Sequence, residues 1–302
     1  MQQLIADLQT ADAGVILTNE PLSAHTTWKI GGPADLLATV HNRDQLVRLM
    51  QLLHAHGTPW HVLGRGSNVL VSDKGVRGAV IKLAGELADA RFEDGLIRAG
   101  GGYSFIKLSV LAGKQGLTGL EFAGGIPGSV GGAVYMNAGA HGSDVSRILK
   151  EAEVVLEDGE VEVWTREDLL FRYRHSVLQE RAGIVTEAVF ALEPGDRKEI
   201  AGAMATYKDR RLRTQPLQLP CAGSTFRNPE GHHAAKLIEA AGLKGQRVGG
   251  AEVSTLHANF IINTGTATAQ DVLDLIDLIR TRIVAQFGVV LTPEVLIMGE
   301  MD

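Results

Sequence analysis

The sequence has almost no cysteine and no long apolar run. Cys221 is the only cysteine in 302 residues, so the chain can form neither an intrachain disulfide nor a cysteine-rich zinc or iron–sulfur site. The N-terminal segment MQQLIADLQTADAG lacks the basic start and apolar stretch of a signal peptide, and no later run approaches the ~18 apolar residues of a membrane span. We therefore expect a cytoplasmic protein without a membrane partner.

Positive charge is also scarce. The chain has 29 Lys and Arg against 35 Asp and Glu, a formal net charge of −6, so it lacks the basic excess of a non-specific nucleic-acid binder. Hydrophobic residues make up 45% of the sequence, which is too apolar for a disordered chain and typical of a globular protein. We therefore expect no nucleic-acid partner. We also expect that the protein binds no metal and that it is a monomer.

Secondary-structure patterns indicate strands mixed with isolated helices. The helix predicted over 42–57 has Asn42 and Gln45 spaced as a capping box and ends at Gly57. Further helices are expected over 103–116, in a charged segment ending near Arg213, over 234–245 and over 268–287. Strands are expected over 61–63, 69–72, 79–83, 96–100 (after a turn at Asp94–Gly95), 184–192, 259–263 and 289–299. Residues 151–164 predict a hairpin about Asp158–Gly159. This mixture predicts an α+β fold.

A polar, turn-rich segment at residues 193–199 marks the preferred domain boundary. The prediction is an N-terminal segment 1–20, a domain 21–195 with lobes at about 21–83 and 84–195, and a C-terminal domain 196–302. About 100 residues is enough for such an independent domain.

Glycine is in excess: 36 of 302 residues, about 12% against a usual ~7%. The first cluster, Gly64 to Asn68, lies between two predicted strands. Consecutive N–H groups can turn toward one concavity there, with side-chain donors from Ser67 and Asn68, which suits a phosphate or pyrophosphate. A tight turn without a ligand is the alternative. A Rossmann fingerprint is excluded because Val69 replaces its third glycine.

The second cluster covers residues 119–140, where seven glycines alternate with apolar residues and almost no charge occurs. A surface linker would be more polar, and a packed helix would avoid the backbone-entropy cost of glycine. The pattern suits a buried loop against a large planar or extended ligand. A glycine-rich structural crossing is equally compatible with it.

Both clusters carry a family resemblance. The segments TTWKIGGPAD, LGRGSNVLV and GLEFAGGIPGSVGGAVYMNAGA, in that order, resemble the UDP-N-acetylenolpyruvoylglucosamine reductases, flavoproteins of peptidoglycan precursor synthesis. The resemblance runs from about Asn19 to the C-terminus. It implies a two-lobed FAD-binding fold of the vanillyl-alcohol-oxidase (PCMH-like) type, followed by an α+β substrate-binding domain.

The resemblance also implies cofactors and their binding residues. FAD would be bound, non-covalently because no covalent linkage motif is evident, and NADPH would supply hydride. The FAD pyrophosphate would be held by Gly64, Arg65, Gly66, Ser67 and Asn68, and the flavin would be lined by Gly124, Gly125, Ile126, Pro127, Gly128, Ser129, Asn137, Ala138, Gly139 and Ala140. No dinucleotide fingerprint marks a separate nicotinamide site, so NADPH and substrate are expected to use one cleft in turn.

Three further motifs match the family and imply catalytic residues: YRHS with Arg174, GSTF with Ser224 and TPEV with Glu294. The reaction implied is reduction of the enolpyruvyl double bond of UDP-N-acetylglucosamine enolpyruvate. Negative charge then builds beside the substrate carboxylate, where the planar guanidinium of Arg174 would stabilise it. Ser224 would donate the proton, and Glu294 would assist as a protonated acid, a form that burial favours.

The UDP phosphates require cations in the C-terminal domain. Arg227, Lys236, Lys244 and Arg247 are available, and Arg227 and Lys236 are the preferred pair. Some family members carry an inserted loop with a substrate-clamping tyrosine between the Arg and Ser motifs. Here these motifs are only 50 residues apart and Tyr207 is the sole tyrosine after Arg174, which resembles the shorter subclass.

The sequence is also compatible in part with functions of other classes. A serine hydrolase is disfavoured because no GxSxG elbow occurs. Another FAD-dependent oxidoreductase of the same fold, or a non-catalytic nucleotide-binding module, would be compatible with the glycine clusters.

Overall fold

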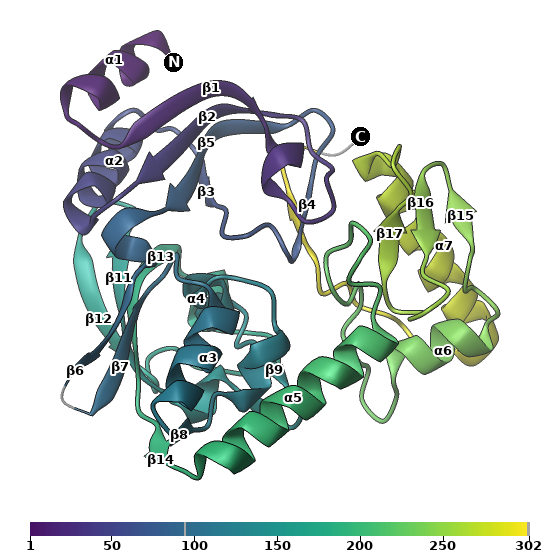
Figure 1. Ribbon diagram of the computed structural model, residues 1–302. Coiled ribbons are helices and arrows are strands. Elements are labelled where there is room, and N and C mark those ends of the chain that lie inside the picture. Colours follow the sequence, from purple (N-terminus) through teal and green to yellow (C-terminus); the bar gives the residue numbers. More distant parts are fainter. Residues whose placement is uncertain (94, 301–302) are drawn as a thin grey trace. The chain divides into compact units, whose positions relative to one another are not determined.

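The structure is a computed structural model that describes residues 1–93 and 95–300 (Figure 1). The chain forms two compact units. Unit 1 comprises Met1–Thr18, Leu36–Gly64 and Gly78–Asp209, and unit 2 comprises Asn19–Asp35, Arg65–Arg77 and the chain from Arg210 onward. The chain therefore passes between the units several times. The linear domains 1–20, 21–195 and 196–302 stay a prediction.

Unit 1 contains an antiparallel five-stranded sheet in the order β12-β11-β13-β7-β6 (Figure 1). Its strands are β6 (Ala90–Glu93), β7 (Leu96–Gly100), β11 (Leu149–Leu156), β12 (Val161–Thr165) and β13 (Gly183–Phe190). Pairing of Val155 with Val161 confirms the predicted hairpin. The sheet's apolar residues form a core with Phe105 and Phe122. In the turn predicted at Asp94–Gly95, Asp94 lies outside the described residues.

Two longer helices of unit 1 begin at side-chain caps. In α2 (Arg43–Ala55), the predicted Asn42 cap accepts a hydrogen bond from Gln45 N at 2.9 Å. The predicted helix at 103–116 is α3 (Phe105–Lys114), which starts after Ser104. Sequence patterns did not indicate α1 (Gln2–Thr10), a nine-residue helix whose buried Leu4 and Leu8 join the core formed around α2. So short a helix forms through this packing rather than through propensity.

The second glycine cluster is not the continuous loop that we expected. It contains a 3-10 turn, η3 (Glu121–Gly125), and a short helix, α4 (Val130–Tyr135). The entropy argument against a helix was outweighed by close packing, because a Cβ at Gly131 would lie only 3.1 Å from the carbonyl oxygen of Gly101. Glycine thus lets α4 approach the neighbouring backbone.

A second sheet and two strand pairs involve further segments of the chain. A four-stranded sheet in the order β1-β2-β5-β3 is formed by β1 (Val15–Pro21), β2 (Pro33–Val40), β3 (Trp60–Val62) and β5 (Val76–Leu83). Two-stranded pairs join β8 (Leu117–Thr118) to β14 (Glu193–Pro194) and β9 (Gly139–Ala140) to β10 (Ser143–Asp144). The charged helix α5 (Arg197–Thr214) contains the boundary between the units at Asp209 and Arg210.

Unit 2 has its own core and two small sheets. In one, β4 (Val69–Val71) pairs in parallel with β18 (Leu296–Met298); in the other, β15 (Arg247–Val248), β16 (Ala251–Val253) and β17 (Ile261–Asn263) are antiparallel. The helices are α6 (Ala234–Ala240) and α7 (Ala269–Phe287). The capping box of Thr268 and Asp271 starts α7, and Gly288 with φ of 69° ends it.

Two predictions for unit 2 were too long. The helix predicted over 234–245 ends at Ala240, and Gly242 with φ of 71° follows its cap. The strand predicted over 289–299 is confined to β18. Pro293 offers no N–H for a ladder, and it forms only an isolated bridge with Phe226. With these corrections, the mixture of helices and mainly antiparallel strands confirms the α+β prediction. No helix in the described part of the chain is long and apolar enough to cross a membrane.

Candidate functional site

The two glycine clusters meet in unit 1. An ideal Cβ at Gly64 would lie 2.5 Å from the hydroxyl oxygen of Ser129, a separation that real Cβ atoms do not adopt. Ser129 is buried and caps α4 by accepting a hydrogen bond from Gly132 N at 3.3 Å. Glycine at position 64 is therefore required for the first cluster to approach the second.

Backbone donors remain available where these clusters meet. No backbone oxygen of the described residues accepts a hydrogen bond from the N–H groups of Gly64, Gly128 or Ser129. Gly128 is instead an acceptor, bonded through its carbonyl to Phe105 N. Uncommitted N–H groups on glycine-rich backbone fit an anionic group such as a pyrophosphate. This donor set is compatible with FAD.

The segment 137–140 has a different character. Asn137 is buried, and its side chain is used inside the protein: Nδ2 donates to Arg172 O at 3.0 Å and Oδ1 accepts from Ser146 N at 3.0 Å. Its φ of 42° turns the chain into the short pair of strands that contains Gly139. The side chain of Asn137 thus holds this segment in place, and a ligand at this position would meet mainly backbone.

Arg174 lies at the corner of a tight turn in unit 1. Arg172 and His175 exchange two backbone hydrogen bonds of 3.0 and 3.1 Å, which leaves Tyr173 and Arg174 at the corner. The φ of Arg174 is 55°, an unfavourable conformation for a residue with a Cβ. Its Nη2 donates to the carbonyl oxygen of Gly139 at 2.8 Å. The structure thus joins the predicted catalytic arginine to the predicted flavin segment.

Sequence reasoning missed an aromatic stack beside this segment. The rings of His141 and Tyr207 are stacked, with centroids 3.8 Å apart and planes 4° from parallel. His141 has a φ of 54° in the turn between β9 and β10, and Tyr207 belongs to α5. The stack attaches the hairpin that contains Gly139 to α5. No sequence signal indicates a pairing across 66 residues.

In unit 2, the rest of the first cluster lies beside the GSTF motif. Gly66, with φ of 63°, comes so close to residues 25 and 26 that a Cβ would lie 2.4 Å from His25 O. Thr27 Oγ1 donates to Gly66 O at 3.1 Å and to Cys221 O at 2.7 Å, which ties the cluster to the segment leading to Ser224. The first glycine cluster and the segment leading to Ser224, which were predicted to bind the cofactor and to act in catalysis, are therefore neighbours.

Ser224 and Glu294 are brought together by backbone pairing in unit 2. Glu294 N donates to Thr225 O at 2.8 Å, and Arg227 N donates to Thr292 O at 2.9 Å. Asn68 joins the same arrangement, since its Nδ2 donates to Glu294 O at 3.2 Å. Ser224 and Glu294 are both half-buried. Three motifs that are far apart in the sequence therefore converge at this place.

The four cations considered for the UDP phosphates have different surroundings. Lys244 pairs with Glu239 at 2.6 Å, and Arg247 pairs with Glu252. Lys236 is exposed on α6 and has no ion pair with a described residue, while half-buried Arg227 directly follows the GSTF motif. The preference for Arg227 and Lys236 is consistent with these contacts and stays a prediction.

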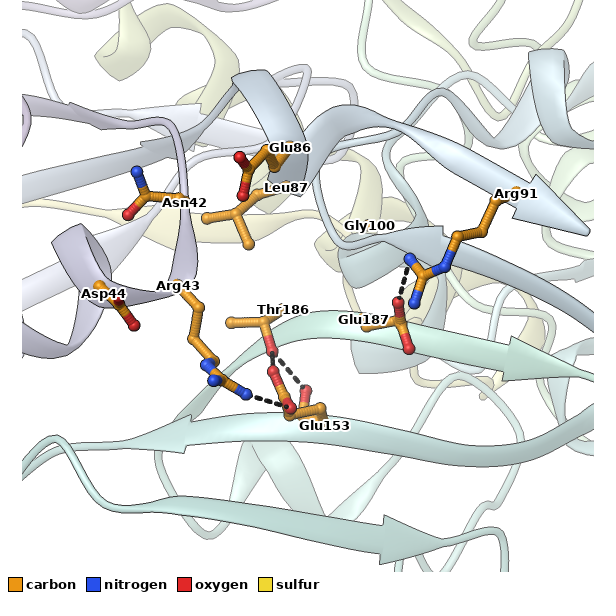
Figure 2. A pocket seen from close by; sticks show the side chains of 10 residues that line it. All are labelled: Asn42, Arg43, Asp44, Glu86, Leu87, Arg91, Gly100, Glu153, Thr186 and Glu187. Atoms are coloured by element: carbon orange, nitrogen blue, oxygen red, sulfur yellow. Dashed lines mark hydrogen bonds and ion pairs between the residues drawn. The ribbon is translucent and has the colours of Figure 1, made fainter. Parts of the chain in front are cut away.

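A cavity of about 510 Å³ in unit 1 contains none of the predicted site residues (Figure 2). Both arginines that line it are paired with carboxylates of the same lining: Arg43 contacts Glu153 at 3.1 Å, and Arg91 contacts Glu187 at 2.7 Å. Among the residues that the structure describes, no group of three or more His, Cys, Asp or Glu could hold a metal ion. We therefore place the candidate site at the glycine clusters.

Two segments of the chain match models of known protein families. Residues 34–165 match the model of an FAD-binding domain, and residues 215–298 match the C-terminal domain of UDP-N-acetylenolpyruvoylglucosamine reductase. A berberine bridge enzyme variant described as a reticuline dehydrogenase aligns with 64% of this chain and 44% of its own, at 11% identity and a TM-score of 0.51. That likeness concerns the fold alone. Together these matches confirm the predicted FAD-binding fold.

Full-length relatives identify the family. The UDP-N-acetylenolpyruvoylglucosamine reductase 1 of Bacillus cereus is 53% identical over 300 residues, covering 99% of this chain and 100% of that protein. A solved structure of the corresponding Thermus caldophilus enzyme covers 94% of this chain and 98% of its own, with 39% identity and a TM-score of 0.81. The family expected from the glycine clusters is thereby confirmed: this chain belongs to the UDP-N-acetylenolpyruvoylglucosamine reductases.

Proposed function

We propose that this protein reduces UDP-N-acetylglucosamine enolpyruvate to UDP-N-acetylmuramate, with FAD as cofactor and NADPH as hydride donor. The observation that carries the proposal is that the motifs containing Asn68, Ser224 and Glu294 lie together. Glu294 N donates to the carbonyl oxygen of Thr225, the residue after Ser224, and Asn68 Nδ2 donates to Glu294 O. Full-length identity of 53% to a named reductase supports the same reaction. When bound, FAD would supply the transfer of a hydride from NADPH to the terminal carbon of the enolpyruvyl group.

Arg174 is the residue that we assign to charge stabilisation. Hydride addition leaves an electron pair on the carbon next to the substrate carboxylate, and this charge spreads into the carboxylate as an enolate. A guanidinium offers a permanent charge and a planar set of donors for such an anion. The bond from Nη2 to Gly139 O restricts the orientation of this group in advance. Preorganised donors of this kind are typically worth about 10²–10³ in rate.

Ser224 and Glu294 are assigned to completing the reduction. The Ser224 hydroxyl gives its proton to the carbon that carries the electron pair, so one hydride and one proton add across the double bond. A hydroxyl is a weak acid, but the carbanion is a strong base, and such proton transfer contributes about 10²–10⁴ in rate. Glu294 acts beside the enolate as a neutral acid, because an ionised carboxylate would repel the enolate.

The glycine clusters are assigned to the cofactor. Residues 64–68 hold the pyrophosphate, and 124–129 with 137–140 line the flavin. The uncommitted N–H groups of Gly64, Gly128 and Ser129 support this assignment. Arg227 and Lys236 bind the UDP phosphates. We further propose that the protein acts as a monomer in the cytoplasm, where its product serves peptidoglycan synthesis and hence cell shape and division.

An anaerobic visible spectrum tests the function. A flavin band that bleaches with NADPH and returns on addition of the enolpyruvyl substrate alone establishes both half-reactions. A band that bleaches and returns only with oxygen would indicate another oxidoreductase of this fold. A protein that cannot be reconstituted with FAD would contradict the proposal. Size-exclusion chromatography with light scattering checks the monomer.

A further inference from the structure

Asn259 is a buried polar residue that the reaction does not use directly. It is only 5% exposed and lies just before β17. Its amide brackets the backbone of Phe226: Oδ1 accepts from Phe226 N at 3.0 Å, and Nδ2 donates to Phe226 O at 2.8 Å. The carbonyl oxygen of Asn259 also accepts from Thr225 N at 2.8 Å. One residue thus makes three hydrogen bonds to the two residues that follow Ser224.

The turn that carries Asn259 is itself constrained. Phe260 N bonds to His257 O at 3.0 Å, and Ser254 Oγ accepts from His257 N at 3.3 Å. The His257 ring accepts from Asn259 N through Nδ1 at 3.2 Å and packs edge-on against the Phe260 ring. Burial, reinforced by Lys244, lowers the pKa of His257 and so favours the neutral ring that this acceptor role needs. The position of Asn259 is therefore fixed by the hydrogen bonds and the ring contact of this turn.

Phe226 and Thr225 are held from the opposite side as well. Thr225 O accepts from Glu294 N at 2.8 Å, and Phe226 forms a bridge with Pro293. Ser224 directly precedes Thr225 in the chain, and before it stands Gly223, whose φ is 72° and where a Cβ would meet only Ser67 O, 3.9 Å away. The location of the Ser224 hydroxyl therefore depends on how firmly Thr225 and Phe226 are fixed.

We propose that Asn259 is the positioning residue of Ser224: its buried side-chain amide fixes Phe226, its backbone carbonyl holds Thr225, and together they set where the Ser224 hydroxyl lies relative to the substrate. This inference rests on the proposed function, in which Ser224 donates the proton. A side chain that acts through placement should affect the proton-transfer step and leave reduction by NADPH intact. A misplacement of about 1 Å can cost on the order of 10² in rate.

The chain offers a matched control in Asn263. It is 6% exposed and also bonds backbone at both ends of its amide, since Nδ2 donates to Trp28 O at 2.9 Å and Oδ1 accepts from Gly265 N at 2.8 Å. The partners of its side chain are Trp28, Gly265 and Ala267, and not Thr225 or Phe226. Asn259→Ala and Asn263→Ala therefore remove similar buried bonds, and only the first releases the Ser224 segment.

The experiment compares the two variants as holoenzymes in single-turnover assays. We expect Asn259→Ala to slow reoxidation by the enolpyruvyl substrate about tenfold or more, with a larger solvent deuterium isotope effect, while reduction by NADPH stays near the wild-type rate. Hydrogen exchange of Phe226 N–H should accelerate. Asn263→Ala should lower the melting temperature without slowing reoxidation. Equal slowing by both variants, or unchanged exchange at Phe226, would overturn the inference.

A second substitution covers the case in which Asn259→Ala does not fold. Asn259→Asp keeps the acceptor for Phe226 N but can donate to Phe226 O only when its carboxyl is protonated. Its reoxidation rate, relative to wild type, should therefore rise as the pH is lowered, whereas Asn263→Asp should show no such rise in reoxidation. A flat ratio would refute the positioning role. If the wild-type protein itself were not reoxidised by the substrate, the proposed function would fail, and this inference with it.

Discussion

The guanidinium of Arg174 donates a 2.8 Å hydrogen bond to the carbonyl oxygen of Gly139, from a backbone that holds a φ of 55°. A left-handed conformation costs a residue with a Cβ about 1–2 kcal/mol. Gln179 Nε2 stabilises the same turn through Arg174 O at 3.1 Å and connects it to Tyr135 O at 3.0 Å. Such a cost at a corner where glycine would fit indicates that the side chain is needed there.

Replacing Arg174 with glycine should lower the catalytic rate while changing the stability of the protein little. Arg174→Gly relieves the backbone strain but also removes the hydrogen bond to Gly139 O, so the free energy of unfolding should change by no more than about 1 kcal/mol. Loss of the guanidinium should lower kcat by about 10²-fold or more. Thermal unfolding and steady-state kinetics measure the two effects. Leu170→Gly is the control, because Leu170 has a φ of 46° and is 57% exposed, and it should gain stability with unchanged kcat. Near-wild-type turnover by Arg174→Gly would remove Arg174 from the mechanism.

Replacing Ser224 with alanine should affect one half-reaction. Ser224 is half-buried and precedes Thr225, whose carbonyl oxygen accepts from Glu294 N. Ser224→Ala should bind FAD and be reduced by NADPH as wild type, while reoxidation by the substrate slows by about 10²–10⁴. Stopped-flow absorbance of the flavin band records both steps. Equal slowing of both half-reactions would argue against a proton-donor role.

Gly64 provides a steric test of the cofactor site. A Cβ at this position would lie 2.5 Å from Ser129 Oγ, so Gly64→Ala should force the two clusters apart. We expect the Kd for FAD to rise at least about tenfold, or ~1.4 kcal/mol. The double variant with Ser129→Ala should recover part of this loss, because the atom in conflict is gone. Fluorescence titration of the apoprotein measures the affinity.

The control for this test is Gly202→Ala in α5. A Cβ there meets no atom within 4 Å, and helical glycine is about 0.5–1 kcal/mol less stable than alanine. This variant should therefore be slightly stabilised and bind FAD normally. If Gly64→Ala also bound FAD with wild-type affinity, the close approach of the clusters would have no role in cofactor binding.

Acid sensitivity should depend in part on Asp271, which caps α7. Burial raises its pKa, but hydrogen bonds from the N–H groups of Thr268 and Gly250, both 3.0 Å long, and from the Thr268 side chain outweigh that effect, so its pKa lies below the ordinary value. A pKa that is lower in the folded state stabilises the fold above the unfolded value of ~3.9, and this stability is lost as the pH falls through the folded pKa.

Asp271→Asn should therefore lower the free energy of unfolding by about 1 kcal/mol at neutral pH. The difference from wild type should shrink as both are brought to acid pH. Denaturant unfolding as a function of pH measures this effect. Asp274→Asn is the control, because Asp274 is exposed on the same helix and accepts a hydrogen bond from the Gln270 side chain rather than from backbone at the start of the helix. A constant difference at every pH would contradict the assignment to the carboxylate charge.

Local patterns determined the elements that depend on neighbouring residues. The Asn42 cap, the hairpin that pairs Val155 with Val161, and Gly288 at the end of α7 all follow from interactions within a few residues. The glycine clusters likewise indicated the family, because their conformational freedom and close approaches are properties of the residues themselves. Packing between residues far apart in the chain could not be predicted from the sequence. The helices α1 and α4 form because Leu4, Leu8 and Gly131 contact residues elsewhere in unit 1.

Only the tertiary structure decided how the catalytic motifs are supported. The sequence by itself named Arg174, Ser224 and Glu294 as candidates through the motifs that contain them. It could not show that Thr225 O accepts from Glu294 N, or that Asn259 brackets Phe226. Such bonds join residues whose separation along the chain carries no periodic signal. They form because buried backbone groups need partners, and the fold determines which partners are within reach.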